Sequence, residues 1–264
     1  MKATTLALIS LLLMAGCGSD YEFAYDFEPG TRGRSFEPAP GCLRKEGCGS
    51  QKSLCGSNSL MATYQFRGKA RFSRSFVQSK QKPVGALRLP GSRPFCTGTL
   101  VSRNLFLTAK HCLTYGVSKY QVVFNLEFNN SGRKKTPRVY AVQRVVEQGN
   151  NLDYAVIKLV GNPGYRQGWS RPSFRPISRG EHLAIIQHPG GTYKQVATGR
   201  SLSRHGHYVA YNVDTLSGSS GSGILGVKGM ILGVHTNGGC SHGDDRNLGV
   251  PMSSIPSRSI LRSL

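Results

Sequence analysis

The chain has 264 residues, enough for one large or two small hydrophobic cores. Its 34 lysine and arginine residues outnumber its 13 acidic residues, and the formal net charge of +21 favours non-specific attraction to anionic polymers. Surface charge that keeps the protein soluble would explain the same excess. The aromatic residues do not alternate with basic residues in a nucleic-acid-binding motif, which argues against specific nucleic-acid recognition.

Residues 1–16 have the pattern of a signal peptide. Lys2 is followed by an apolar run, Leu6 to Met14, that is too short to span a bilayer. Met14-Ala15-Gly16-Cys17 resembles a bacterial lipobox, which implies cleavage before Cys17 and a lipid on its thiol. An ordinary signal peptide with an incidental cysteine is the alternative. Gly18, in place of an aspartate, favours an exported protein anchored at the outer membrane or cell surface, with release after processing left open.

Residues 17–60 are rich in Gly, Pro, Ser and charge, and they predict a tether or pro-segment. With Cys17 lipidated, six cysteines remain, and an even number in an exported chain favours disulfides over a metal site. No CxxC pair occurs and no histidine lies at a zinc-type spacing from these cysteines, so no metal is expected; the chemistry considered below also needs no cofactor. Cys96 and Cys112 are the predicted bridge. The pairing of the other four stays open: Cys42, Cys48, Cys55 and Cys240.

From about residue 61, short apolar runs alternate with Gly, Pro and Asn turns, a spacing that predicts a β-barrel or sandwich. One folded domain is expected over residues 61–264. Strands of a first barrel, residues 61–165, are expected at 84–87, 98–101, 120–124, 139–146 and 154–160. Strands of a second barrel, residues 175–250, are expected at 182–187, 194–198, 208–213, 223–227 and 230–234. Residues 256–264 predict a short C-terminal helix.

Three residues could together form a nucleophilic site. His111 follows an apolar run, Asp153 opens the strand-like segment 154–159, and Ser220 lies in a glycine-flanked turn. A serine hydroxyl needs a base to accept its proton, and histidine has a suitable pKa near neutral pH. A carboxylate then orients the imidazole. The backbone N–H groups of Gly218 and Ser220 would stabilise the oxyanion.

The motifs around these residues resemble those of a known family. Residues 95–101 leading into Leu107-Thr108-Ala109-Lys110-His111-Cys112 look like the chymotrypsin-fold serine peptidases, which share the order His, Asp, Ser. Residues 218–222, 151–155, 187–191 and 211–215 resemble their bacterial glutamyl-endopeptidase branch, the group of staphylococcal V8 protease. The resemblance covers roughly residues 84–251. It implies an all-β fold of two packed antiparallel barrels with the triad between them.

Some residues depart from the family pattern. Lys110 stands beside the base where Ala or Gly is usual, and Gly223 replaces a usual proline. Ser219 replaces the aspartate that pairs with a new N-terminus in trypsin-like enzymes, so activation by that ion pair is not expected. These departures motivate an alternative to the exported serine endopeptidase, a catalytically silent relative that binds through its basic surface. Esterase activity is a third option, since acyl transfer needs the same groups.

The substrate preference depends on three further residues. Asp214 lies at the position of the trypsin pocket aspartate, which would favour Lys or Arg at the cleaved position. Thr215 and His235 match the positions at which glutamyl endopeptidases bind a glutamate carboxylate, and both side chains can donate hydrogen bonds. Because that branch often carries Asp-Thr here, the sequence predicts preference for Glu or Asp in protein or peptide substrates.

Overall fold

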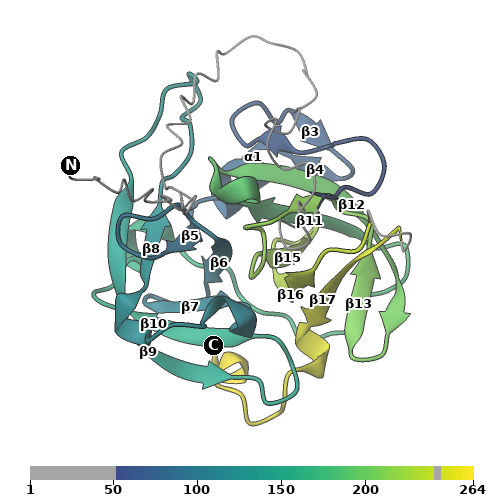
Figure 1. Cartoon of the computed structure of the whole chain (residues 1–264). Coiled ribbons are helices and arrows are strands. Elements are labelled where there is room, and N and C mark those ends of the chain that lie inside the picture. The colour runs from purple at the N-terminus through teal and green to yellow at the C-terminus, as the bar shows by residue number, and fades with distance from the viewer. Residues whose placement is uncertain (1–51, 241–244) are drawn as a thin grey trace, which may run out of the picture. The chain divides into compact units, whose positions relative to one another are not determined.

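The computed structural model describes residues 52–240 and 245–264, which form two closed antiparallel β-barrels (Figure 1). The predicted fold class is therefore confirmed. The proposed lipid site Cys17 and the cysteines Cys42 and Cys48 lie outside the described residues. No helix among the described residues is long and apolar enough to cross a membrane.

The first barrel has the strand order β10-β7-β6-β5-β8-β9. Its strands are β5 (Val84–Arg88), β6 (Cys96–Leu100), β7 (Leu105–Thr108), β8 (Gln121–Phe124), β9 (Arg138–Gln148) and β10 (Ala155–Leu159). All five expected runs form strands, because their β-branched and aromatic side chains fill the barrel interior. A Cβ at Gly98 would lie 2.3 Å from the Phe106 ring, so the close approach of β6 to β7 requires glycine there.

The second barrel is closed by pairing of β11 with β12. Its strands are β11 (His182–Gln187), β12 (Gln195–His205), β13 (Tyr208–Tyr211), β15 (Gly223–Gly226), β16 (Ile231–Asn237) and β17 (Asn247–Pro251). The sequence reading missed β17, which carries Asn, Gly and Pro. Strand β2 (Met61–Ala62) pairs with β12, so residue 61, the expected start of the first barrel, contributes instead to the sheet of the second.

Short elements connect and flank the barrels. They are β1 (Lys52–Ser53), β3 (Gly68–Lys69), β4 (Phe72–Ser73), α1 (Arg74–Lys80), α2 (Gly164–Gln167) and β14 (Thr215–Leu216). The C-terminal region expected as a helix contains a 3₁₀ turn, Ile260–Ser263, preceded by another at Met252–Ser254. The Ser259 hydroxyl caps the last turn by accepting from Leu261 N, and Ile260 N donates to Glu147 of β9 at 2.7 Å.

A buried ion pair connects the two barrels and α1. Glu127, in the loop after β8, and Lys194, just before β12, are both fully buried and form an ion pair. Lys194 Nζ also donates to the Gln81 carbonyl at 2.7 Å, and Lys135 Nζ lies 2.6 Å from the second Glu127 oxygen. Burial alone would raise the pKa of Glu127, but the two lysines outweigh it and lower the pKa.

Replacing Glu127 is expected to destabilise the fold strongly. Glu127→Gln keeps the shape but leaves the Lys194 ammonium buried without a counter-charge, which costs about 3–5 kcal/mol of unfolding free energy in urea titrations at pH 7. Because the folded-state pKa of Glu127 is lowered, the contribution of its ion pair is complete at neutral pH and is lost as the pH falls through that pKa.

The matched control is Glu181→Gln. Glu181 pairs with Arg175, whose side chain is 47% exposed, and an exposed pair of this kind contributes about 1 kcal/mol or less. Equal losses in the two variants would contradict the importance of the buried pair.

Candidate active site

His111 lies on a 3₁₀ turn, Lys110–Cys112, immediately after β7. The residues before it, Thr108 and Ala109, are buried, so the turn leaves the barrel at a fixed point. A disulfide between Cys96 and Cys112 ties this turn to the start of β6, with Cα atoms 6.2 Å apart. The predicted bridge is present, and it restrains the residue next to the imidazole.

Asp153 contacts His111 because β7 and β10 are paired. Thr108, at the end of β7, lies opposite Ala155, at the start of β10. Asp153 Oδ2 lies 2.6 Å from His111 Nδ1, and Oδ1 accepts from the His111 backbone N–H at 2.9 Å. Burial raises the pKa of Asp153, but the hydrogen bonds and charge of His111 outweigh it and lower the pKa. The ring is thus held with Nδ1 toward the carboxylate, which leaves Nε2 to accept a proton.

Lys110 supports the loop that carries Asp153. Its Nζ donates to the Gly149 carbonyl at 2.9 Å and to the Asn150 carbonyl at 3.4 Å. The cation therefore binds main-chain oxygens of this loop, where the sequence analysis had seen only a charge beside the base.

Ser220 lies in a turn that packs against the ends of β6 and β7. Gly218 and Gly221 have φ of 90° and 88°, a region that favours glycine. A Cβ at Gly221 would lie 2.2 Å from Thr108 Oγ1, and Thr97 N donates to the Ser220 carbonyl at 2.8 Å. The Ser220 carbonyl also lies 3.8 Å from Cys112 Sγ, next to His111.

The structure thus brings Ser220 beside the turn that carries His111, but among the described residues no hydrogen bond joins the Ser220 hydroxyl to the imidazole. Such bonds are often long without substrate and shorten in the reacting complex.

Two backbone N–H groups in this turn are available to a ligand. Neither the Gly218 nor the Ser220 N–H donates to any described group. The Ser217 carbonyl accepts from Gly190 N at 2.6 Å, and the Gly218 carbonyl accepts from the Thr97 hydroxyl at 2.7 Å. These bonds fix the peptide planes on both sides of Gly218. The turn can therefore offer its two free donors to a developing oxyanion.

Thr215 and His235 are buried on elements next to this turn. Thr215 Oγ1 has no hydrogen-bond partner among the described residues. Burial lowers the pKa of His235 to about 4, so the ring is neutral at pH 7. His235 Nδ1 lies 2.6 Å from Tyr211 Oη, which donates to the Leu248 carbonyl at 3.1 Å. His235 also accepts from Gly221 N through its backbone carbonyl, which places it directly behind the Ser220 turn.

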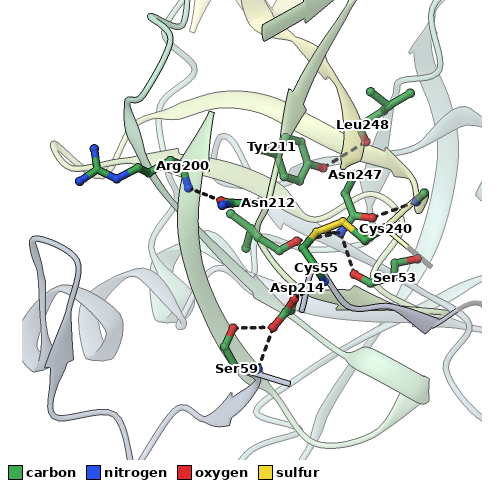
Figure 2. Close-up of a disulfide and its surroundings, with 12 residues drawn as sticks. Ser53, Cys55, Ser59, Arg200, Tyr211, Asn212, Asp214, Cys240, Asn247 and Leu248 are labelled. Carbon is green, nitrogen blue, oxygen red and sulfur yellow. Dashed lines mark hydrogen bonds between the residues drawn. A yellow bond between two sulfur atoms is a disulfide. The ribbon is translucent and has the colours of Figure 1, made fainter. Parts of the chain in front are cut away.

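Asp214 does not face a substrate (Figure 2). Its carboxylate accepts from Cys55 N at 2.7 Å, from Ser59 N at 2.7 Å and from Ser59 Oγ at 2.6 Å. The residue is only 2% exposed. These bonds argue against the substrate-binding role considered for Asp214, because the carboxylate accepts three hydrogen bonds from Cys55 and Ser59.

Residues 52–60, expected to lie in the tether, are part of the folded domain. Strand β1 pairs with β14, so that Ser53 lies opposite Thr215. A disulfide joins Cys55 to Cys240, and Asn247 Nδ2 donates to the carbonyls of Ser53 and Val213 at 2.8 Å each (Figure 2). The sequence analysis missed this arrangement, and its one available signal was a Cys55 without an assigned partner.

The described residues contain one close set of metal-type ligands, Cys96, His111 and Cys112, within 4.8 Å of one another. The two cysteines are joined in a disulfide, so they offer no thiolate to a metal ion.

Comparisons with known proteins agree with this geometry. A family model for the trypsin-like peptidase domain matches residues 96–234, more than half of the chain. The chain belongs to the trypsin-like peptidase family. Secreted RxLR effector protein 73 of Plasmopara viticola is 26% identical over 220 residues, which cover 73% of this chain and 52% of that protein. The chain therefore spans about half the length of this curated relative.

Two solved structures share the fold of this trypsin-like peptidase. One, a Glu endopeptidase in complex with MPD, has a TM-score of 0.57 and 23% identity, and the match covers 75% of this chain and 93% of that one. The other is a serine-to-alanine mutant of Rv3671c from M. tuberculosis H37Rv in its inactive form, with a TM-score of 0.54 and 14% identity, and the match covers 70% of this chain and 89% of that one. At these identities the likeness shows the fold alone.

Removing the Asp214 carboxylate is expected to release residues 52–60. Asp214→Ala deletes the acceptor of three hydrogen bonds, so the amides of Cys55 and Ser59 should exchange with deuterium on the order of tenfold faster or more. Ser57→Ala, an exposed change in the same segment, is the control and should leave both rates unchanged. Unchanged exchange in Asp214→Ala would show that the disulfide, the β1–β14 pairing and the Asn247 bonds hold the segment without the carboxylate.

Proposed function

We propose that the protein is a serine endopeptidase that uses Ser220, His111 and Asp153. The observation that carries the proposal is the His111–Asp153 hydrogen bond beside the glycine-flanked Ser220 turn, within a trypsin-like peptidase domain. Asp153 orients the ring and stabilises its charged form, and the turn supplies both the hydroxyl and the two free N–H donors.

The chemistry follows from these positions. Nε2 of His111 accepts the Ser220 proton as Oγ attacks the scissile carbonyl carbon, and the N–H groups of Gly218 and Ser220 stabilise the oxyanion. The imidazolium then protonates the leaving amine, and the peptide C–N bond breaks to leave an acyl-enzyme. Water, deprotonated by His111, attacks the ester, and the proton returns to Ser220 as the acid product leaves.

Labelling with a fluorophosphonate probe tests the nucleophile. The protein should be labelled, and Ser220→Ala should not, because the probe bonds covalently only to an activated serine. Ser217→Ala, an exposed serine of the same turn, is the control and should label normally. Asp153→Asn should lower kcat on a peptide substrate by about 10⁴. A protein that stays unlabelled after every processing step would be the silent, surface-binding relative.

We further infer a preference for glutamate, and to a lesser degree aspartate, at the cleaved position. Thr215 supports it, because its buried hydroxyl has no partner and can donate to a carboxylate. His235 becomes a second donor once a bound carboxylate raises its pKa. The Asp214 carboxylate, on which a trypsin-like preference would depend, is bound by Cys55 and Ser59 instead.

Peptide substrates ending in Glu, Gln, Lys or Arg at the cleaved position test this preference. Thr215→Val should lower kcat/KM for the Glu substrate on the order of tenfold or more, because a donor to a charged group is lost, and should affect the Gln substrate less. The matched control is Thr63→Val, which alters another buried, unpartnered hydroxyl away from the site. Cleavage only after Lys or Arg would contradict the glutamyl preference.

The proposed location is outside the cytoplasm, with a lipid on Cys17 as the membrane anchor. Its support is the lipobox-like Met14-Ala15-Gly16-Cys17 at the end of an apolar run. Two lipid signals or more are needed for stable anchoring. N-terminal sequencing of the mature protein separates a lipid-bearing Cys17 from removal of the segment.

A further inference from the structure

We propose that a basic pocket on the first barrel is a second binding site for protein substrates, one that takes acidic segments away from the cleaved bond. Its role in substrate recognition rests on the proposed endopeptidase activity. The cavity has a volume of about 680 Å³, within the usual range of ligand sites. Its lining includes four cationic and two aromatic side chains: Arg103, Arg144, Lys158, Arg171, Tyr165 and Trp169.

The side chains that line this pocket carry four positive charges and no negative charge. The anion at its edge is the α-carboxylate of Leu264, the last residue of the sequence, which also lines the pocket. Within the part of the chain that the structure describes, none of its four cations forms an ion pair. Placing four like charges around one cavity has a cost that an anionic ligand removes, and the arrangement raises the local concentration of acidic segments.

Exposed aromatic rings border the pocket. Tyr165 is 71% exposed and Trp169 is 43% exposed, whereas most large apolar side chains of the barrels are buried. Aliphatic side chains also line the cavity: Val101, Leu105, Val146 and Ile260. Aromatic residues and arginine together are typical of protein-binding surfaces, where rings cover apolar atoms and guanidinium groups pair with carboxylates.

The pocket walls are held by backbone hydrogen bonds. Gly164 N, at the start of α2, donates to the Arg103 carbonyl at 2.8 Å, and a Cβ at Gly164 would lie 2.6 Å from Arg103 Cα. Ile231 N donates to the Arg171 carbonyl at 2.9 Å, which fixes the linker to the second barrel. A site formed by such walls loses little conformational freedom when a ligand binds.

The pocket lies at the end of β7 and β10 that is remote from the catalytic residues. Thr108 pairs with Ala155 next to His111 and Asp153, whereas Leu105 pairs with Lys158 at the pocket. Strands rise about 3.3 Å per residue, so the paired segment alone separates the two sites by about 10 Å. An extended chain spans about 3.3–3.6 Å per residue, so a substrate must extend at least about three residues away from the catalytic residues to contact both sites.

An acidic protein segment fits this site better than a nucleic acid does. A nucleic-acid strand needs a row of cations that follows its phosphates. Here the cations surround a single cavity with aliphatic walls, which suits the aliphatic stems of glutamate and neighbouring apolar side chains. Contact at two points raises the effective concentration of the scissile bond at the catalytic site.

Binding to the Ser220→Ala variant tests the pocket independently of catalysis. The probe is a fluorescein-labelled peptide rich in Glu and Asp that contains one Trp, followed by fluorescence anisotropy. Replacing three exposed cations, Arg103→Gln, Arg144→Gln and Arg171→Gln, should raise Kd about tenfold. The matched control removes the same charge elsewhere, with Lys69→Gln, Arg204→Gln and Lys228→Gln, and should change Kd by less than about twofold.

Equal weakening in the two triple variants would overturn the proposal, because it would assign binding to net charge. A DNA oligonucleotide that depends on the pocket cations while the acidic peptide does not would also overturn it, in favour of a nucleic-acid site.

Cleavage assays with Ser220 intact provide the second test. The pocket variant should lower kcat/KM on an acidic protein about tenfold and leave hydrolysis of a short Glu-ending peptide unchanged. An equal loss on both substrates would mean that the pocket acts only through the fold. If the unsubstituted protein cleaves neither substrate, the proposed function fails, and the binding test on Ser220→Ala still decides the pocket.

Discussion

The pairing of β7 with β10 determines what this molecule can do. Placing Thr108 opposite Ala155 brings the turn after one strand against the loop before the other, and His111 meets Asp153 there. The register matters because a slip of one residue would reverse the side-chain direction along the strand and move both loops. The Cys96–Cys112 disulfide and the Lys110 contacts with the Asp153 loop reinforce the same junction.

Three acidic residues in the described part of the chain bind groups within the fold. Glu127 binds two lysines, Glu147 accepts from Tyr154 and from the C-terminal turn, and Asp214 holds the N-terminal segment. These carboxylates therefore do little to neutralise the many surface cations. Most of the lysine and arginine side chains behind the net charge of +21 therefore remain at the surface. Four of them line the pocket beside α2.

The sequence predicted the features that depend on residues close together in the chain. Alternating apolar runs predicted the strands, and the residues flanking His111 and Asp153 identified their partnership, because these patterns reflect neighbouring residues.

The sequence did not predict contacts that join segments far apart in the chain. Ser59 and Asp214 are 155 residues apart, and neither residue type nor spacing signals their bond. A hydrogen bond between the Ser220 hydroxyl and the imidazole is absent among the described residues, and its formation depends on side-chain rotation, which no sequence pattern specifies. Strand β17 was not predicted because Asn, Gly and Pro have low strand propensity, which tertiary packing overrides here.

The Cys55–Cys240 disulfide closes a loop with a sequence separation of 185. In the chain-entropy model, closing a loop of that size lowers the conformational entropy of the unfolded chain and so raises its free energy by about 5 kcal/mol. It also has a topological effect. After a single backbone break at any position between the two cysteines, including a break made by the protein's own activity, the two fragments stay covalently attached. An enzyme of this architecture can survive self-digestion as a nicked but intact particle.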